Sequence, residues 1–257
     1  MIKRLAVIIA GEYRMWPRAS KYLLDYFKNR AEQTDFFFVT WNLNAGVPVT
    51  ESNVTDYFVD ANLVGLQLCT VIPEKHTYYK QAYLSKVGNT LKRQQELKNN
   101  FVYDQVVETR PDLYLRRDAV EWVPCEEFEY VIAPTKMKVE GTTPGMLFMM
   151  DIYYRSTSLT NDIISNRYWN IKSKFSNYAN ITSGVPFVGH HWFLPDYLMQ
   201  HRLISQSDRM DYGFNTVIRS YFPDVDLDTL SSDEILDFHA YASANKIDDI
   251  YRRPAFI

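Results

Sequence analysis

At the start of the chain, apolar residues follow the pattern of a strand, a helix and a second strand. Leu5 to Ala10 is a nearly continuous apolar run that ends at Gly11, which is typical of a parallel strand buried on both faces. Trp16 to Arg30 carries apolar residues at helical spacing, with Pro17 near its start, where proline is tolerated. Phe36 to Thr40 is the next apolar run. This order predicts a βαβ unit with a right-handed crossover.

The pattern further along predicts more elements of the same kind. Val64 to Ile72 and Tyr103 to Thr109 are strand-like, and His76 to Asn99 between them is predicted to be a long, polar-rich helix. Tyr130 to Ala133 is a short predicted strand, and Asp151 to Tyr168 is predicted to be helical. Alternating strands and helices indicate an α/β fold with a mostly parallel central sheet flanked by helices.

No internal repeat, low-complexity tract or linker divides the sequence. Its 257 residues are enough for one large domain with a sizeable core, so we expect a single domain over residues 1–257. Residues 1–135 form the regular strand–helix half, and residues 136–257 are expected to pack against it.

Composition and charge narrow the class of protein. A hydrophobic content of 46% with 23% charged residues is ordinary for a soluble protein, and a net charge of −3 argues against general nucleic-acid binding. No segment approaches the ~20 apolar residues of a membrane helix, and the first apolar run is too short for a secretory signal. Cys69 and Cys125 lie far apart, without metal-ligand or redox spacing, so a cytoplasmic location is expected.

Two strand ends carry the residues with the clearest chemical potential. In open α/β sheets, ligands bind just beyond the carboxyl ends of the strands. At the first end, Ala10 and Gly11 let a ligand approach the backbone, and Arg14 can clamp a phosphate through two hydrogen bonds. An ordinary turn glycine followed by a surface arginine is the alternative interpretation.

At the second end, the strand runs into the segment from Glu108 to Asp112. Pro111 cannot continue a central ladder, so Asp112 is expected at the carboxyl edge of the sheet. Arg110, two residues earlier, is expected on the same face and can neutralise a leaving diphosphate. Asp112 itself is placed to hold a divalent cation that bridges phosphate oxygens. The alternative is an Arg–Asp surface pair in a tight turn.

Other candidates are less specific. Asp151 follows an apolar run and is expected to cap the next helix, with a role as base or acceptor ligand as the alternative. Adjacent histidines are poor metal ligands, but His191, beside Trp192, can bind a sugar or donate to a phosphate.

The long predicted helix adds three cations. Lys86 can reach the phosphate-binding site expected at the two strand ends, whereas Lys92 and Arg93 are expected to lie on a solvated face.

Five segments together resemble bacterial and phage glycosyltransferases of the lipopolysaccharide and capsule type. They are RLAVIIAGEYR with TDFFFVTWN (residues 4–14 and 34–42), YDQVVETRPDLYL (103–115), MMDIYYRSTSLTNDI (149–163) and HHWFLPDYLMQHRLI (190–204). They occur in the same order as in that family, and the ordered set carries the resemblance.

The resemblance implies a GT-A fold, which is a Rossmann-like domain that binds a nucleotide-sugar at the carboxyl ends of its strands. It implies a sugar donor, with a UDP-sugar favoured, a hydroxyl acceptor on a glycan, and Mn²⁺ or Mg²⁺ at Asp112. The family's metal motif is Asp-x-Asp, and here Arg110 takes its first position, so that arginine can replace part of the metal's role. Asp151 and His191 are the candidates for a catalytic base.

Two other functions fit the same residues. One is a binding module that recognises a glycan or a nucleotide without catalysis. The other is a different phosphate-handling α/β transferase, which would need a second carboxylate near Asp112, with Glu108 or Asp118 as the close options.

Overall fold

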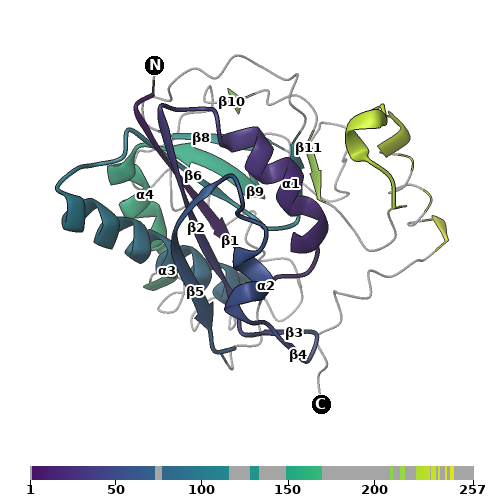
Figure 1. Cartoon of the computed structure of the whole chain (residues 1–257), viewed down its shortest axis with the longest axis horizontal. Coiled ribbons are helices and arrows are strands. Elements are labelled where there is room, and N and C mark those ends of the chain that lie inside the picture. The colour runs from purple at the N-terminus through teal and green to yellow at the C-terminus, as the bar shows by residue number, and fades with distance from the viewer. Residues whose placement is uncertain are drawn as a thin grey trace, which may run out of the picture.

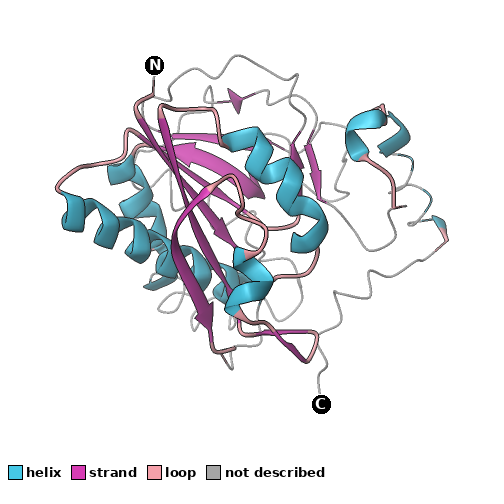
Figure 2. Cartoon of the chain, viewed as in Figure 1, coloured by secondary structure: helices cyan, strands magenta, loops and turns pink. Residues whose placement is uncertain are grey.

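A central sheet with helices on both faces organises the computed structural model of this chain (Figures 1 and 2). The structure describes residues 2–72, 77–115, 128–132, 149–169, 209–210, 215–217, 224–231 and a few positions between 233 and 245. The strands of the sheet, in spatial order, are β10 (Arg209–Met210), β8 (Phe128–Ile132), β9 (Met149–Ser156), β6 (Gln105–Thr109), β1 (Arg4–Ala10), β2 (Gln33–Trp41) and β5 (Asn62–Cys69). Neighbouring strands are parallel except that β9 is antiparallel to both β6 and β8.

Smaller elements complete the described structure. The α-helices are α1 (Trp16–Phe27), α2 (Glu51–Thr55), α3 (Thr77–Asn99) and α4 (Ser158–Ser165), and a 3₁₀ helix, η1, spans Leu227–Thr229. Two antiparallel pairs lie outside the main sheet: β3 (Leu43–Asn44) with β4 (Val47–Pro48), and β7 (Leu113–Leu115) with β11 (Asn215–Val217).

The alternation of side chains along β1 builds two separate cores. Leu5, Val7 and Ile9 pack on the face covered by α1 and α2, in a cluster that includes Trp16, Leu23 and Phe27 of α1 and Val54 of α2. Ala6, Ile8 and Ala10 pack on the other face, in a cluster that includes Leu84 of α3. Because β1 is buried on both faces, its sequence is continuously apolar, as parallel central strands require.

The direction of chain travel reverses beside β1. The crossover through α1 leads from β1 to β2, and the chain then continues outward to β5. Helix α3 then brings the chain back across the opposite face of the sheet to β6, on the other side of β1. The carboxyl ends of β1 and β6 are therefore a topological switch point, where ligands of open α/β sheets bind.

The predicted α/β class, the parallel β1–α1–β2 unit and the long helix α3 are all confirmed. The helix predicted from Asp151 is wrong over its first residues, because Asp151 lies in strand β9. Tyr153 and Tyr154 favour extended backbone, and β9 pairs with neighbours on both sides. The helix starts only at Ser158, where the side chain of Thr157 accepts a hydrogen bond from the amide of Thr160 and forms the N-cap.

The expectation that Lys92 lies on a solvated face is also wrong, because its side chain is fully buried between α3 and α4. Its ammonium donates to the hydroxyl and carbonyl oxygens of Ser158 and to Asp162, at 2.6 to 3.1 Å. Burial lowers the pKa of Lys92, and the carboxylates of Asp162 and Glu96 oppose that change.

None of the described helices combines the length and the apolar character that crossing a membrane requires.

Candidate functional site

The loops after β1 and β6 are in direct contact at the switch point. A Cβ atom added to Gly11 would lie 2.7 Å from Cδ of Pro111, so only glycine permits this approach. The amide of Gly11 donates to the carbonyl of Val39 at 3.1 Å. The side-chain amide of Gln81, near the start of α3, donates to the carbonyl of Ala10 at 2.9 Å. Three elements therefore fix the backbone at the end of β1.

Two arginines meet one carboxylate at this place, in what we call the arginine cluster (Arg14, Arg110 and Asp112). Arg110 donates from Nε to Oδ1 of Asp112 at 2.9 Å and from Nη2 to Oδ2 at 2.7 Å. Nη1 of Arg14 lies 3.9 Å from the same Oδ2. Arg110 and Asp112 thus pair across a turn, as in the alternative interpretation, except that Asp112 is buried, and the loops after β1 and β6 together assemble the cluster.

The local sequence explains this geometry. Pro111 ends the ladder of β6, and the next strand, β7, leaves the main sheet to pair with β11. Tyr114 in β7 is buried and donates a hydrogen bond to Asp228 at 2.8 Å, which fixes the chain just beyond the cluster. The turn from Arg110 to Asp112 is therefore held at both ends.

The cluster carries two positive charges and one negative charge, and these are unequally exposed. The side chain of Asp112 is only 2% exposed, whereas those of Arg14 and Arg110 are 15% and 19% exposed. Glu12 forms a further hydrogen-bonded ion pair with Nε of Arg14 and is more exposed than either arginine. Both guanidinium groups are therefore open to an incoming anion, which would compete with Glu12 for Arg14. Asp112 holds the two arginines together from the buried side.

The arrangement does not fit a divalent cation at Asp112. Both of its oxygens accept hydrogen bonds from Arg110, and its side chain is buried. In the part of the chain that the structure describes, no three His, Cys, Asp or Glu side chains come together in a metal-binding group. Asp112 is therefore a partner of the arginines and not a metal ligand in this arrangement.

Of the other predicted site residues, Lys86 lies elsewhere, whereas Asp151 comes two residues before Tyr153, the partner of Thr109 at the end of β6. The ammonium of Lys86 stands 3.8 Å from the ring centre of Trp169, and burial lowers the pKa of this lysine. Lys86 thus contacts the end of the α4 region rather than the arginine cluster. Asp151 is in β9, and His191 lies outside the described residues.

Glu108 belongs to a buried polar cluster that the sequence did not reveal. Its carboxylate accepts hydrogen bonds from the hydroxyl of Ser85 in α3 and from Nη2 of Arg167, the latter at 3.2 Å. Arg167 also donates to the hydroxyl of Tyr154, which lies opposite Glu108 in the β6–β9 pair. Because Glu108 pairs with Ser85 of α3 and with Arg167, it is a poor candidate for the second carboxylate that a different phosphate-handling transferase would need beside Asp112. The one sign of this cluster in the sequence is a glutamate within an otherwise apolar strand, which indicates a buried carboxylate with a partner.

A cavity of about 580 Å³ opens between the end of β5 and α3, and no sequence pattern predicts it. Gln67, Leu68, Cys69, Thr70, Val71 and Ile72 line one side, and Tyr83 and Val87 line the other. Tyr83 stacks on Trp41 at the end of β2, with ring centres 5.9 Å apart. Burial raises the pKa of the Cys69 thiol to about 11, so this thiol stays protonated at neutral pH.

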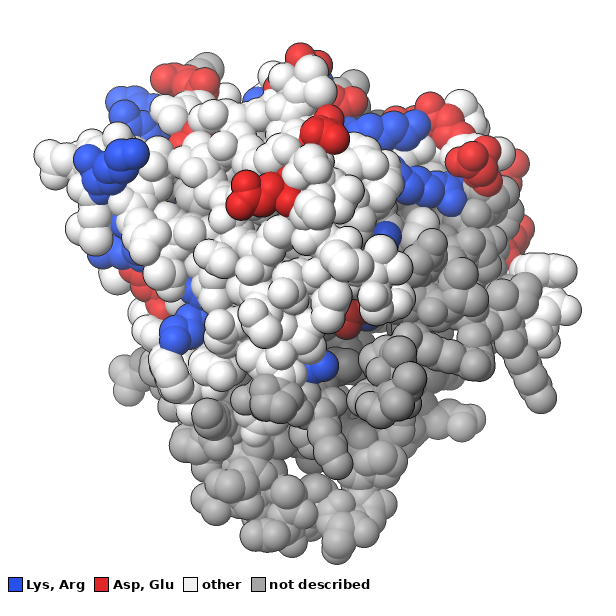
Figure 3. All heavy atoms as spheres, turned by 60° about the horizontal axis from the view of Figure 1, so that its bottom comes forward, with Lys and Arg blue, Asp and Glu red and all other residues white. Residues whose placement is uncertain are grey.

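Figure 3 turns the carboxyl ends of the strands towards the viewer, and most of the described surface there is uncharged, with a few acidic side chains within it and basic side chains towards its edges. No protein-family model matches the chain, and no curated protein sequence matches it significantly.

Proposed function

We propose that this protein is a glycosyltransferase that transfers a sugar from a nucleoside-diphosphate donor, with a UDP-sugar favoured, to a hydroxyl group of a glycan. The observation that carries the proposal is the convergence of Arg14 and Arg110 on one buried carboxylate at the switch point of the sheet. Two guanidinium groups at the carboxyl ends of parallel strands suit a diphosphate better than a neutral ligand.

The fold supports the same assignment. A mostly parallel sheet with helices on both faces and a switch point between β1 and β6 is compatible with the GT-A fold that the sequence resembles. Two of the segments that carry the resemblance end at Arg14 and pass through Asp112, and these are the segments that meet in the cluster.

In the proposed reaction, the bond between the anomeric carbon and the diphosphate oxygen breaks while the acceptor hydroxyl bonds to that carbon. Negative charge develops on the diphosphate, and the guanidinium groups of Arg14 and Arg110 stabilise it. The acceptor's proton passes to a base, for which Asp151 and His191 remain our candidates. Asp112 takes no proton in this scheme, because its role is to hold the two cations in place.

Direct binding measurements test the proposal. UDP-, GDP-, CMP- and dTDP-sugars are titrated with and without Mn²⁺, and binding is read by thermal shift and calorimetry. A ligand at a hundred times its dissociation constant adds ~2.7 kcal/mol of stability, which is easily detected. Arg14→Gln and Arg110→Gln are the test variants. Arg30→Gln is the matched control, because Arg30 follows α1 at the opposite end of the sheet.

We expect one nucleotide class to bind the wild type and Arg30→Gln equally, and to bind Arg14→Gln and Arg110→Gln at least tenfold more weakly. Release of free sugar from the bound donor then separates a transferase from a non-catalytic binding module, which would bind without turnover. If no nucleotide binds, or if both test variants bind like the wild type, the proposal is overturned.

A further inference from the structure

The C-terminal segment around η1 holds one tyrosine from each element that follows the arginine cluster. Tyr22 of α1 donates to Oδ1 of Asp226 at 2.9 Å, and its hydroxyl oxygen accepts a hydrogen bond from the amide of Leu227 at 2.9 Å. Tyr114 of β7 donates to Asp228 at 2.8 Å and lies 3.3 Å from the carbonyl oxygen of Leu227. Residues 226–228 therefore join α1 to β7. We call this arrangement the C-terminal clamp (Tyr22, Tyr114 and residues 226–228).

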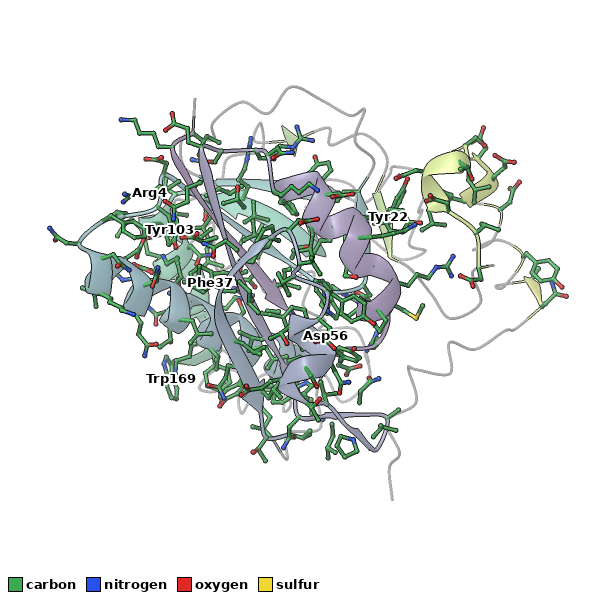
Figure 4. The ribbon with its side chains drawn as sticks, viewed as in Figure 1. Arg4, Tyr22, Phe37, Asp56, Tyr103 and Trp169 are labelled. Atoms are coloured by element: carbon green, nitrogen blue, oxygen red, sulfur yellow. The ribbon has the colours of Figure 1, made fainter. Side chains whose placement is uncertain are left out.

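The clamp is packed as well as hydrogen-bonded. The rings of Tyr22 and Tyr114 meet edge to face, with centres 5.0 Å apart, and both are buried beside Leu227. Ala19 belongs to the same cluster and Met15 packs against it, so that with Tyr22 they form an i, i+4, i+7 row on α1. Figure 4 shows Tyr22 on the side of α1 that is turned towards the C-terminal segment. One stripe of α1 therefore faces the clamp, beginning at the residue after Arg14.

The arginine cluster lies between this clamp and a second attachment of the same two loops. Gly11 packs against Pro111 at the ends of β1 and β6. Along the chain, Arg14 comes between Gly11 and α1, and Asp112 comes between Pro111 and β7. The two loops are therefore fastened to each other both before and after Arg14 and Asp112.

The direct contact between the loops inside the cluster is too long to set their spacing. Nη1 of Arg14 lies 3.9 Å from Oδ2 of Asp112, which is beyond the range of a hydrogen bond. The distance between Arg14 and Asp112 therefore depends on the attachments of the backbone on either side. Because Arg110 is bonded to Asp112, the same attachments set the distance between the two guanidinium groups.

We propose that Tyr22 and Tyr114 are positioning residues for the anion site, and that docking of residues 226–228 on them sets the spacing of Arg14 from Arg110. Two guanidinium groups bind one diphosphate together only if their separation matches it, so the C-terminal segment controls the affinity of the site without touching the ligand. This inference rests on the proposed function, because it names what holds that site in place.

The first test needs no ligand. The Nε–H signal of Arg14 in an NMR spectrum of the full chain, assigned by its loss in Arg14→Gln, reports the surroundings of this side chain. We expect Tyr22→Phe combined with Tyr114→Phe to shift this signal, because the clamp no longer binds the two loops together. Tyr103→Phe is the matched control. It also removes a hydroxyl that is bonded to an aspartate, but at the amino ends of the strands, and it should leave the signal in place.

A second pair of variants leaves both tyrosines intact. Asp228→Ala removes the acceptor of Tyr114 and should shift the Arg14 signal as well. Asp228→Asn keeps an acceptor at this position and should restore the signal of the wild type. Thermal unfolding verifies that each variant is folded at the temperature of the spectra.

The second test measures anion affinity by calorimetry, with inorganic pyrophosphate as the probe. The double tyrosine variant should bind at least tenfold more weakly than the wild type, which corresponds to ~1.4 kcal/mol, about the contribution of one hydrogen bond to a charged group. Tyr103→Phe should bind like the wild type.

Two results would overturn the inference. They are an Arg14 signal that is unchanged in the double tyrosine variant, and pyrophosphate affinity that is equal in this variant and the wild type. A wild type that binds neither pyrophosphate nor any nucleotide-sugar overturns the proposed function instead, and the Arg14 signal then decides the role of the clamp by itself.

Discussion

Arg110 binds both carboxylate oxygens of Asp112 across the single intervening residue Pro111, at 2.9 and 2.7 Å. Because Pro111 also packs against Gly11, this ion pair and the contact between the loops after β1 and β6 form one unit. The electrostatics of the candidate site and the packing of the switch point are therefore coupled.

Asp112→Ala should destabilise the protein, because it leaves two arginines without their shared buried carboxylate. We expect a loss of about 2 kcal/mol in the free energy of unfolding, less than for a fully buried pair since Arg110 is 19% exposed. Urea unfolding measures it. Asp25→Ala is the control, because the ion pair of Asp25 with Lys28 lies at the surface, and the substitution should cost no more than ~0.5 kcal/mol. Equal losses in the two variants would contradict the role given to Asp112.

Gly11→Ala should also destabilise the protein, by ~1–3 kcal/mol, because the added Cβ meets the ring of Pro111. The double variant Gly11→Ala with Pro111→Ala removes that ring and should recover part of the loss. Thermal unfolding of the two single variants and the double variant gives the coupling. If the two effects simply add, the clash is not the cause.

The β1–α1–β2 unit could be predicted from the sequence because its signals are local. The double-sided burial of β1 and the spacing of Trp16, Leu23 and Phe27 are visible in the chain itself. The pairing of Arg110 with Asp112 could be predicted for the same reason, since the two are separated only by a proline that ends the strand.

The remaining features depend on contacts distant in sequence. The segment that starts at Asp151 has apolar residues at helical spacing, which predicts a helix, but β6 and β8 impose extended backbone on it from both sides. Lys92 resembles a surface lysine until Ser158 and Asp162 of α4 cover it. Likewise, no local pattern brings Arg167 to Glu108, which are 59 positions apart.

Glu108→Ala should destabilise the protein more than Asp112→Ala or Gly11→Ala. It removes the carboxylate that faces Arg167 in a site where both side chains are almost fully buried, and breaking such a pair costs ~3–5 kcal/mol. Glu108→Gln keeps an acceptor for Ser85 and should lose less. Chemical denaturation of both variants is the measurement, with Glu108→Leu combined with Arg167→Met as the apolar replacement. That double variant should be more stable than Glu108→Ala, and the reverse order would show that the pair is not the cause.

Tyr103 should make the stability of the protein depend on pH in the alkaline range. Its hydroxyl donates to Asp35 at 2.6 Å, and Figure 4 places Tyr103 near Phe37, at the end of α3. Burial, with the negative charge of Asp35, raises the pKa of Tyr103 in the folded state.

The sign of this dependence follows from linkage. A pKa raised on folding means that the folded state retains the proton where the unfolded state releases it, so the stabilisation is complete below pH ~10 and decreases above it. Tyr103→Phe lacks this proton. The difference in unfolding free energy between wild type and variant should therefore be ~1 kcal/mol or more at pH 8. It should shrink by up to ~1.4 kcal/mol per pH unit above pH 10. Other tyrosines titrate in both proteins and cancel in the difference. A difference that stays constant up to pH ~11.5 would show that Tyr103 does not hold its proton in the folded state.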